Sequence, residues 1–376
     1  MTFSKGTPNT QRAFFALLQA GLWEKDVQLL PFGNIDFKEL LQLAEEQSVV
    51  GLIAAGLEHV VDVKPAKKDV LQFAGRTIQL EQRNLAMNQF VGKLILKMRK
   101  HDIYAILVKG QGVAQCYERP YWRTCGDVDL FLSDSNYDQA KALLTTIASS
   151  VEEEVEYHKH LGLTIDGWVV ELHGSLRCGL SKKIDNALDI FRVDTFNGGN
   201  VRSWDCNGVP VFQLAIENDI LYVFTHFLNH FYRGGIGLRQ ICDWLRLLWT
   251  YRETIDRILL ESKIRQMGLM TIWKGFAAFA VDWLGMPVDA MPFYSSDARW
   301  SRKAKRIKDF VLEVGNFGHN RDMSYYSSNS FLVRKTLSLR QRIGDLFRHS
   351  RIFPMDSLRF FWGITINGIR MAWEDR

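Results

Sequence analysis

The feature that most constrains the fold is the segment Gly126-Asp127-Val128-Asp129, which is followed by the apolar run Leu130-Phe131-Leu132. Side chains alternate between the two faces of a strand, so Asp127 and Asp129 would share one face and Val128 the other. Two like charges this close raise each other's pKa and cost stability, and a divalent cation removes that cost. Asp-x-Asp alone is common on exposed strands, where it is only a solvated face. Here the apolar run predicts a buried strand, and buried carboxylate pairs rarely persist without a ligand.

A glycine-rich turn lies upstream of this pair. The apolar segment 103–108 is typical of a short buried strand; it ends at Lys109-Gly110-Gln111-Gly112, and a helical pattern follows at 113–117. A turn that leads into a helix N-terminus offers backbone N–H groups and the positive end of the helix dipole, which favour phosphate. The P-loop and Rossmann patterns are absent, so the turn alone indicates only a tight turn. Combined with Asp127 and Asp129, it predicts a nucleoside triphosphate site.

These segments resemble the nucleotidyltransferase superfamily typified by DNA polymerase β, and within it a poorly characterised bacterial group of uncharacterised nucleotidyltransferases. The resemblance covers roughly residues 95–250. Its most specific part is the Gly-Asp-x-Asp element with Lys109-Gly110 upstream of it. The other matching positions are 114–117, Pro120, Arg123, 170–173, His226, His230, 237–239 and 243–245.

The resemblance implies an α+β fold: a small mixed sheet of the nucleotidyltransferase type, flanked by N-terminal helices and a mainly helical C-terminal region. It also implies that Asp127 and Asp129 hold Mg²⁺ or Mn²⁺ and that Glu171, on a neighbouring strand, completes the catalytic site. The residues that would meet the phosphates of an NTP are Lys109, Gly110, Gln111, Gly112 and Arg123. The implied reaction is two-metal transfer of a nucleotidyl group from an NTP to a hydroxyl of an acceptor of unknown identity.

One position departs from the superfamily pattern. Gln111 stands where Ser or Gly usually follows the first glycine of the turn. This departure favours an alternative function, a catalytically silent nucleotidyltransferase-like module that binds a nucleotide or a partner protein. Both functions allow NTP binding, but only the enzyme releases pyrophosphate when an acceptor is present.

A hairpin is predicted next to the site. Segment 168–173 is expected to be a strand that places Glu171 and His173 on one face, and Asp166-Gly167 is a turn signal that joins it to a strand at 161–165. A further strand is expected at 152–158. His158 and His160 then lie near the sheet edge. They are either surface or structural residues, or they face the site.

A second pair of histidines lies in a helical segment. His226 and His230 have the i, i+4 spacing of zinc ligands, but the protease motif is absent and no third ligand is evident. Packed or nucleotide-facing histidines are therefore favoured over zinc. The glycine-rich loop 234–237 follows, and Arg233 and Arg239 beside it could both reach phosphate.

Helical patterns dominate both ends of the chain. Asp36 can cap a helix, and 66–100 is a long helical pattern that Gly75 can break. Its core face is expected to contain Met87, Phe90, Val91, Leu94, Ile95 and Met98. The expected division is an N-terminal helical region at 1–100, an α/β core at 101–200 and a C-terminal helical region at 201–376.

Charge is unevenly distributed. The whole chain carries a net charge of +5, whereas residues 299–349 contain 12 Lys/Arg and 4 Asp/Glu. This segment could meet nucleic acid, an anionic lipid surface or a phosphorylated partner, which gives a third interpretation, a nucleic-acid-binding protein with salt-sensitive affinity. The basic residues at 302–308 surround a helix instead of forming one stripe, which is typical of a solvated face, so nucleic acid is not favoured.

The sequence predicts a cytoplasmic protein without a membrane span. The first residues are polar and lack the apolar core of a signal peptide, and the five cysteines have no metal-binding spacing. The longest apolar stretch, 270–286, is interrupted by Lys274 and Asp282 and is expected to be a buried helix.

Overall fold

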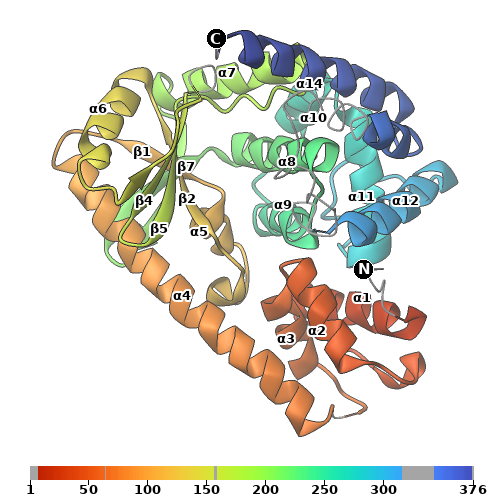
Figure 1. Cartoon of the computed structure of the whole chain (residues 1–376). Helices are drawn as coiled ribbons and strands as arrows, with labels where there is room; N and C mark the ends of the chain where they lie inside the picture. The colour runs from red at the N-terminus through yellow and green to blue at the C-terminus, as the bar shows by residue number, and fades with distance from the viewer. Residues whose placement is uncertain (1–6, 64, 156–158, 316–342, 375–376) are drawn as a thin grey trace, which may run out of the picture.

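The computed structural model describes residues 7–63, 65–155, 159–315 and 343–374. The fold is a mixed α+β fold with a seven-stranded sheet and helices at both ends of the chain, as the sequence predicted (Figure 1). The N-terminal helices are drawn in red and orange, the sheet lies beside the long orange helix, and the C-terminal helices are drawn in green to blue.

The N-terminal region forms the predicted helices. Asp36 caps α2 by accepting hydrogen bonds from the backbone N–H groups of Lys38 and Glu39. The long helix α4 continues through Gly75, and it reaches from the first helices to the sheet (Figure 1). The six apolar residues predicted for its core face are all buried. The elements are α1 (Pro8–Trp23), η1 (Leu30–Phe32), α2 (Phe37–Glu46), α3 (Val50–Glu58) and α4 (Lys67–Arg99).

The sheet has the strand order β3-β4-β5-β2-β1-β7-β6. The pairs β2–β5 and β1–β7 are parallel, and the other neighbours are antiparallel. The strands that carry the conspicuous acidic residues, β2 and β5, are therefore direct neighbours. The strands are β1 (Ala105–Val108), β2 (Asp127–Leu132), β3 (Ser150–Val151), β4 (His160–Ile165), β5 (Trp168–His173), β6 (Val201–Cys206) and β7 (Val209–Leu214).

The β4–β5 hairpin forms as predicted, whereas the strand before it is shorter than expected. Asp166 and Gly167 both have positive φ angles, 51° and 78°, as a type I′ hairpin turn requires. In place of a strand at 152–158, the chain forms the two-residue strand β3, and Val155 makes an isolated bridge to His160. Residues 156–158, and with them His158, lie outside the described residues.

The two faces of the sheet pack against different parts of the chain. Val128, Leu130 and Leu132 face a core that also contains residues of α4 and of α6 (Asp134–Thr145). Phe131 lies on the opposite face, in the core shared with the C-terminal helices. Because side chains alternate, the face that carries Phe131 also carries the acidic residues of β2, so these residues face the C-terminal helices.

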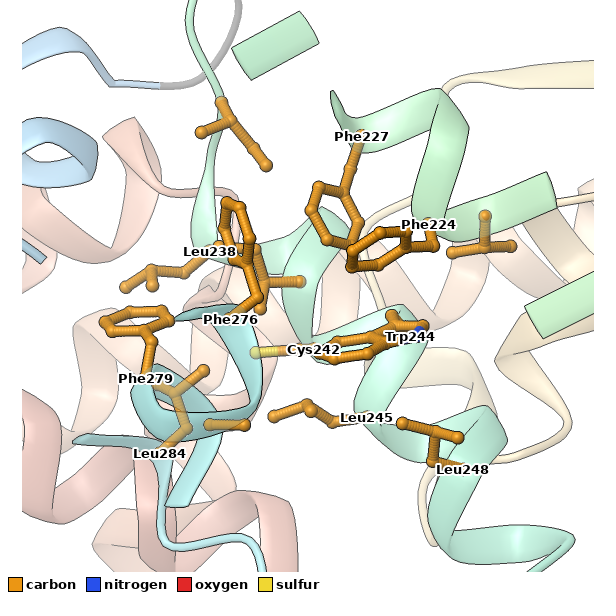
Figure 2. Close-up of a cluster of buried hydrophobic side chains, with 14 of the residues drawn as sticks. Phe224, Phe227, Leu238, Cys242, Trp244, Leu245, Leu248, Phe276, Phe279 and Leu284 are labelled. Carbon is orange, nitrogen blue, oxygen red and sulfur yellow. The ribbon is translucent and has the colours of Figure 1, made fainter. Parts of the chain in front are cut away.

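The C-terminal helices pack around a cluster of aromatic side chains (Figure 2). The ring centroids of Phe224 and Trp244 are 5.1 Å apart, and those of Phe227 and Phe276 are 4.9 Å apart. Burial of each such ring contributes about 1.5–3 kcal/mol. The remaining elements are α5 (Gly110–Ala114), η2 (Pro120–Trp122), α7 (Lys182–Phe196), α8 (Ile216–Arg233), α9 (Leu238–Thr250), α10 (Arg257–Met267), α11 (Met270–Leu284), α12 (Ala298–Val314), a helical segment at 343–350 and α14 (Pro354–Glu374).

The apolar segment of the C-terminal region is a buried helix, and part of its basic segment makes hydrogen bonds within the protein. The stretch at 270–286 forms the buried helix α11, and within the described ranges no helix is long and apolar enough to cross a bilayer. In α12, Lys303 donates to the backbone carbonyl of Ile352, and Arg306 donates to that of Arg351. These two basic side chains therefore hold α12 to the segment just before α14. The part of the basic segment at 316–342 lies outside the described residues.

Candidate active site

Three carboxylates converge on the face of the sheet that meets the C-terminal helices. Asp129 on β2 is the register partner of Glu171 on the parallel strand β5. Asp127 lies two residues before Asp129 and therefore on the same face. One carboxylate oxygen from each of the three residues lies within 4.8 Å of the others. The local strand register thus brings together the three acidic residues that the sequence analysis selected.

Asp129 has two basic side chains as close partners. Its Oδ1 atom lies 2.6 Å from Nζ of Lys109 and 2.9 Å from Nε2 of His173. Lys109 reaches this position from the end of β1, where the backbone takes a positive φ of 57° before α5 begins. Burial alone would lower the pKa of Lys109, but the negative charge of Asp129 raises it, so the ammonium group stays charged.

Glu171 lies between two histidines. Its Oε2 atom is 3.2 Å from Nε2 of His160 and 3.4 Å from Nε2 of His173. Burial alone would raise the pKa of Glu171, but hydrogen bonds from both imidazoles hold it well below its ordinary value. Burial alone would lower the pKa of His173, but its hydrogen bonds with Asp129 and Glu171 raise it.

Asp127 has a different environment from the other two carboxylates. The nearby charge of Asp129, together with burial, raises the pKa of Asp127. In the described part of the chain Asp127 makes none of the close ion pairs that hold Asp129 and Glu171. An ionised Asp127 therefore adds unbalanced negative charge to a set of oxygen ligands that suits a divalent cation.

A pocket opens over these carboxylates. It encloses about 690 Å³ of space outside the protein atoms, part of which is open solvent. Lys109, Gly110 and the carboxylates form one wall. The opposite wall comes from α8 and α9, and its polar members include His226, His230 and Arg239.

His226 and His230 face the carboxylates from α8. Their Nε2 atoms are 3.1 Å apart, so one ring can donate to the other. Burial and the positive charge of Lys109 lower the pKa of both rings, that of His230 to about 4, so both are neutral near pH 7. Among the described residues, no third histidine, cysteine or carboxylate forms a metal-binding group with them.

The predicted glycine-rich turn divides into two parts. Lys109 and Gly110 line the pocket, whereas Gln111 and Gly112 do not. The amide Nε2 of Gln111 lies 3.2 Å from Oδ1 of Asn84, and its Oε1 accepts from the Cys125 thiol at 3.2 Å.

Gly112 packs against a side chain beneath the pocket. A Cβ atom at this position would lie 2.5 Å from Nε2 of Gln213, which is a buried side chain of β7. A larger residue at position 112 would therefore have to displace the end of the Gln213 side chain.

Arg123 lines the pocket but is engaged in a buried ion pair. Its Nε and Nη2 atoms donate to the two carboxylate oxygens of Asp243 on α9, each at 2.7 Å. Tyr117 donates a further 2.7 Å hydrogen bond to Asp243. Burial alone would raise the pKa of Asp243, but the charge of Arg123 and these hydrogen bonds hold it below its ordinary value. This pair fastens α9 to the segment that precedes β2.

Arg239 is a second arginine at the pocket. It is the second residue of α9 and donates from Nη1 to the backbone carbonyl of Thr124 at 3.2 Å. Its Nε is buried without a hydrogen-bond partner among the described residues. The sequence signal for this residue was its place directly after the glycine-rich loop 234–237.

Comparison with known proteins gives one match. The family model described as "Uncharacterised nucleotidyltransferase" matches residues 33–285, which is more than half of the chain. No curated protein and no solved structure gives a significant match. The matched residues run from the end of η1 to α11 and contain both walls of the pocket.

Proposed function

The chain belongs to the uncharacterised nucleotidyltransferase family, and we propose on this basis that it transfers a nucleotidyl group from an NTP to a hydroxyl of an acceptor molecule. The observation that supports this function best is the convergence of Asp127, Asp129 and Glu171 at a pocket that also contains Lys109 and Arg239. Carboxylates beside cationic side chains are the arrangement that metal-dependent phosphoryl chemistry needs.

Asp127, Asp129 and Glu171 would hold Mg²⁺ or Mn²⁺. Their oxygen atoms, and the unbalanced charge of Asp127, fit divalent cations. When bound, a metal pair stabilises the attacking and leaving oxygens of an in-line displacement at phosphorus. The chain itself fixes the carboxylates on two hydrogen-bonded strands, so little reorganisation is needed on substrate binding.

Lys109, the backbone of Gly110 and Arg239 would contact the triphosphate. Lys109 already lies at the acidic cluster, and the Nε of Arg239 has hydrogen-bonding capacity to offer. Arg123 would act mainly by positioning: it and Arg239 both donate to the carbonyl of Thr124, at 3.3 and 3.2 Å. The acceptor hydroxyl would enter from the side of His226, which lines the wall opposite the carboxylates.

A catalytically silent module is the alternative function, and its main support was Gln111. The Gln111 side chain points to Asn84 and Cys125 and does not line the pocket. The Gln111 side chain therefore has a structural role, while the hydroxyl that a Ser at this position would offer a triphosphate is missing.

The test measures both binding and turnover. Calorimetry with a non-hydrolysable ATP analogue and Mg²⁺ should show binding, and pyrophosphate release should be followed with each of the four NTPs in the presence of small-molecule fractions of a bacterial lysate. Asp129→Asn should abolish release, whereas Asp138→Asn, an exposed change on α6, should not. Failure of every NTP to bind the folded protein would contradict the proposed function. Binding without pyrophosphate release in any fraction would favour the silent module.

A further inference from the structure

Two histidines adjoin the acidic cluster on the side away from Asp127. His160 on β4 is the register partner of His173 on β5, and Glu171 lies two residues before His173 on the same face of β5. Asp129 is the partner of Glu171 on β2. Three neighbouring strands therefore present two imidazoles and two carboxylates in adjacent positions on one face of the sheet.

The donor atoms have the spacing of ligands around a single ion. Ligand atoms that lie about 2.0–2.2 Å from one metal ion are about 3 Å apart along the edges of its coordination shell. Here Nε2 of His173 is 2.9 Å from Oδ1 of Asp129 and 3.4 Å from Oε2 of Glu171. Nε2 of His160 is 3.2 Å from the same Glu171 oxygen.

Each imidazole makes one hydrogen bond to a carboxylate, His160 to Glu171 and His173 to Asp129. An imidazole Nε2 carries one proton and donates one well-directed hydrogen bond. Nε2 of His173 nevertheless approaches two carboxylates, and one oxygen of Glu171 is approached by both imidazoles. A single cation would contact one donor atom from each of His160, Glu171 and His173, which all lie within 4.8 Å of one another.

Two of the three residues in this group offer imidazole nitrogen, and the third offers a carboxylate oxygen. We infer that His160, His173 and Glu171 form a binding site for one divalent first-row transition-metal ion beside Asp127 and Asp129, and that this site therefore prefers Mn²⁺ or Zn²⁺ to Mg²⁺. Imidazole nitrogen suits such ions, whereas Mg²⁺ takes oxygen ligands.

This inference rests on the proposed function only through the shared residue Glu171, and its test does not depend on activity. Mn²⁺ alone is titrated into the metal-free full-length protein by calorimetry, and Mg²⁺ is titrated in parallel. The variants are His160→Gln and His173→Gln, and the matched control is His101→Gln, an exposed histidine just after α4. Thermal melts check that each variant is folded. Pulsed electron paramagnetic resonance of bound Mn²⁺ in the unaltered protein detects imidazole nitrogen directly and needs no variant.

The expected result is a selective loss of Mn²⁺ binding. Each site variant should bind Mn²⁺ at least about tenfold more weakly, with Mg²⁺ affinity changed by less than about threefold and the control unchanged. Unaltered Mn²⁺ affinity in both variants, or no nitrogen signal from bound Mn²⁺, overturns the histidine site. If Asp129→Asn still abolishes metal binding in that case, the proposed function stands without it. If no divalent ion binds the unaltered chain, the histidine site and the metal-dependent function both fail.

Discussion

The Lys109 ammonium lies 2.6 Å from Oδ1 of Asp129, whose side chain is only 2% exposed. The lysine therefore supplies positive charge at the position where metal-dependent chemistry would also place a cation. Lys109→Met should destabilise the metal-free protein by about 3 kcal/mol, because Asp129 loses a buried counter-charge. Mn²⁺ should recover more stability in this variant than in the parent. Urea denaturation with and without Mn²⁺ measures both effects, and Lys93→Met, an exposed change on α4, is the control. Equal stability of Lys109→Met and the parent would show that the ion pair does not stabilise the fold.

Asp127→Asn should have the opposite effect on the metal-free protein, because it removes a like-charge repulsion. Asp129 and burial raise the pKa of Asp127 above the ordinary value of 3.8, so the folded state binds this proton more tightly than the unfolded chain does. Stability is therefore lost as the pH rises through the interval between the two pKa values. The stability advantage of the variant should grow with pH upward from about 4, while its Mg²⁺ affinity falls at least about tenfold. Thermal melts across this pH range measure the stability difference, and calorimetry measures the Mg²⁺ affinity. A variant less stable than the parent at pH 7 would show that Asp127 is not destabilised by charge repulsion.

Gly112→Ala should lower the free energy of unfolding more than it lowers nucleotide affinity. The new Cβ would lie 2.5 Å from Nε2 of Gln213, and such overpacking costs about 1–3 kcal/mol. The double variant with Gln213→Ala should regain much of this loss, because the obstructing side chain is removed. Chemical denaturation of the parent, both single variants and the double variant gives the coupling free energy. Strict additivity would show that the two residues do not meet.

Asp243→Asn should be strongly destabilising, because it leaves the buried Arg123 guanidinium without a full counter-charge. The expected loss is about 3–5 kcal/mol. A matched control is Asp189→Asn, which interrupts the similar but partly exposed pair with Arg177 and should cost less than about 1 kcal/mol. Equilibrium unfolding of both variants at pH 7 makes the comparison. Similar losses in the two would show that burial does not set the strength of these pairs.

Local sequence patterns were sufficient for the acidic residues and for most helices. The alternation in β2 predicted that Asp127 and Asp129 share a face, and the turn at Asp166-Gly167 predicted the β4–β5 hairpin. The hairpin β6–β7 was not predicted, although Asn207 and Gly208 form the same kind of turn, with φ of 55° and 82°. The pair Asn207-Gly208 is itself a sequence signal for such a turn.

The parts of the site that could not be predicted depend on contacts between distant segments. The partner of Arg123 is Asp243, 120 positions away, and Gly112 packs against Gln213 across the α5–β7 contact. No local periodicity encodes such pairs, because they form only when the helices dock on the sheet. For the same reason the sequence assigned Arg123 and Gln111 to the phosphates, whereas the structure gives both side chains supporting contacts within the protein.

The pocket has walls from two separate stretches of the chain, and this division limits how the protein can be cut. A fragment ending at residue 200 would keep all three carboxylates, but it would lose β7, which pairs with β1, and the whole wall formed by α8 and α9. Its acidic face would then be an open surface instead of a floor beneath a ligand. A fragment must extend into α9 to contain every residue that lines the pocket, and the rings of α8 and α9 pack in turn on Trp273 and Phe276 of α11.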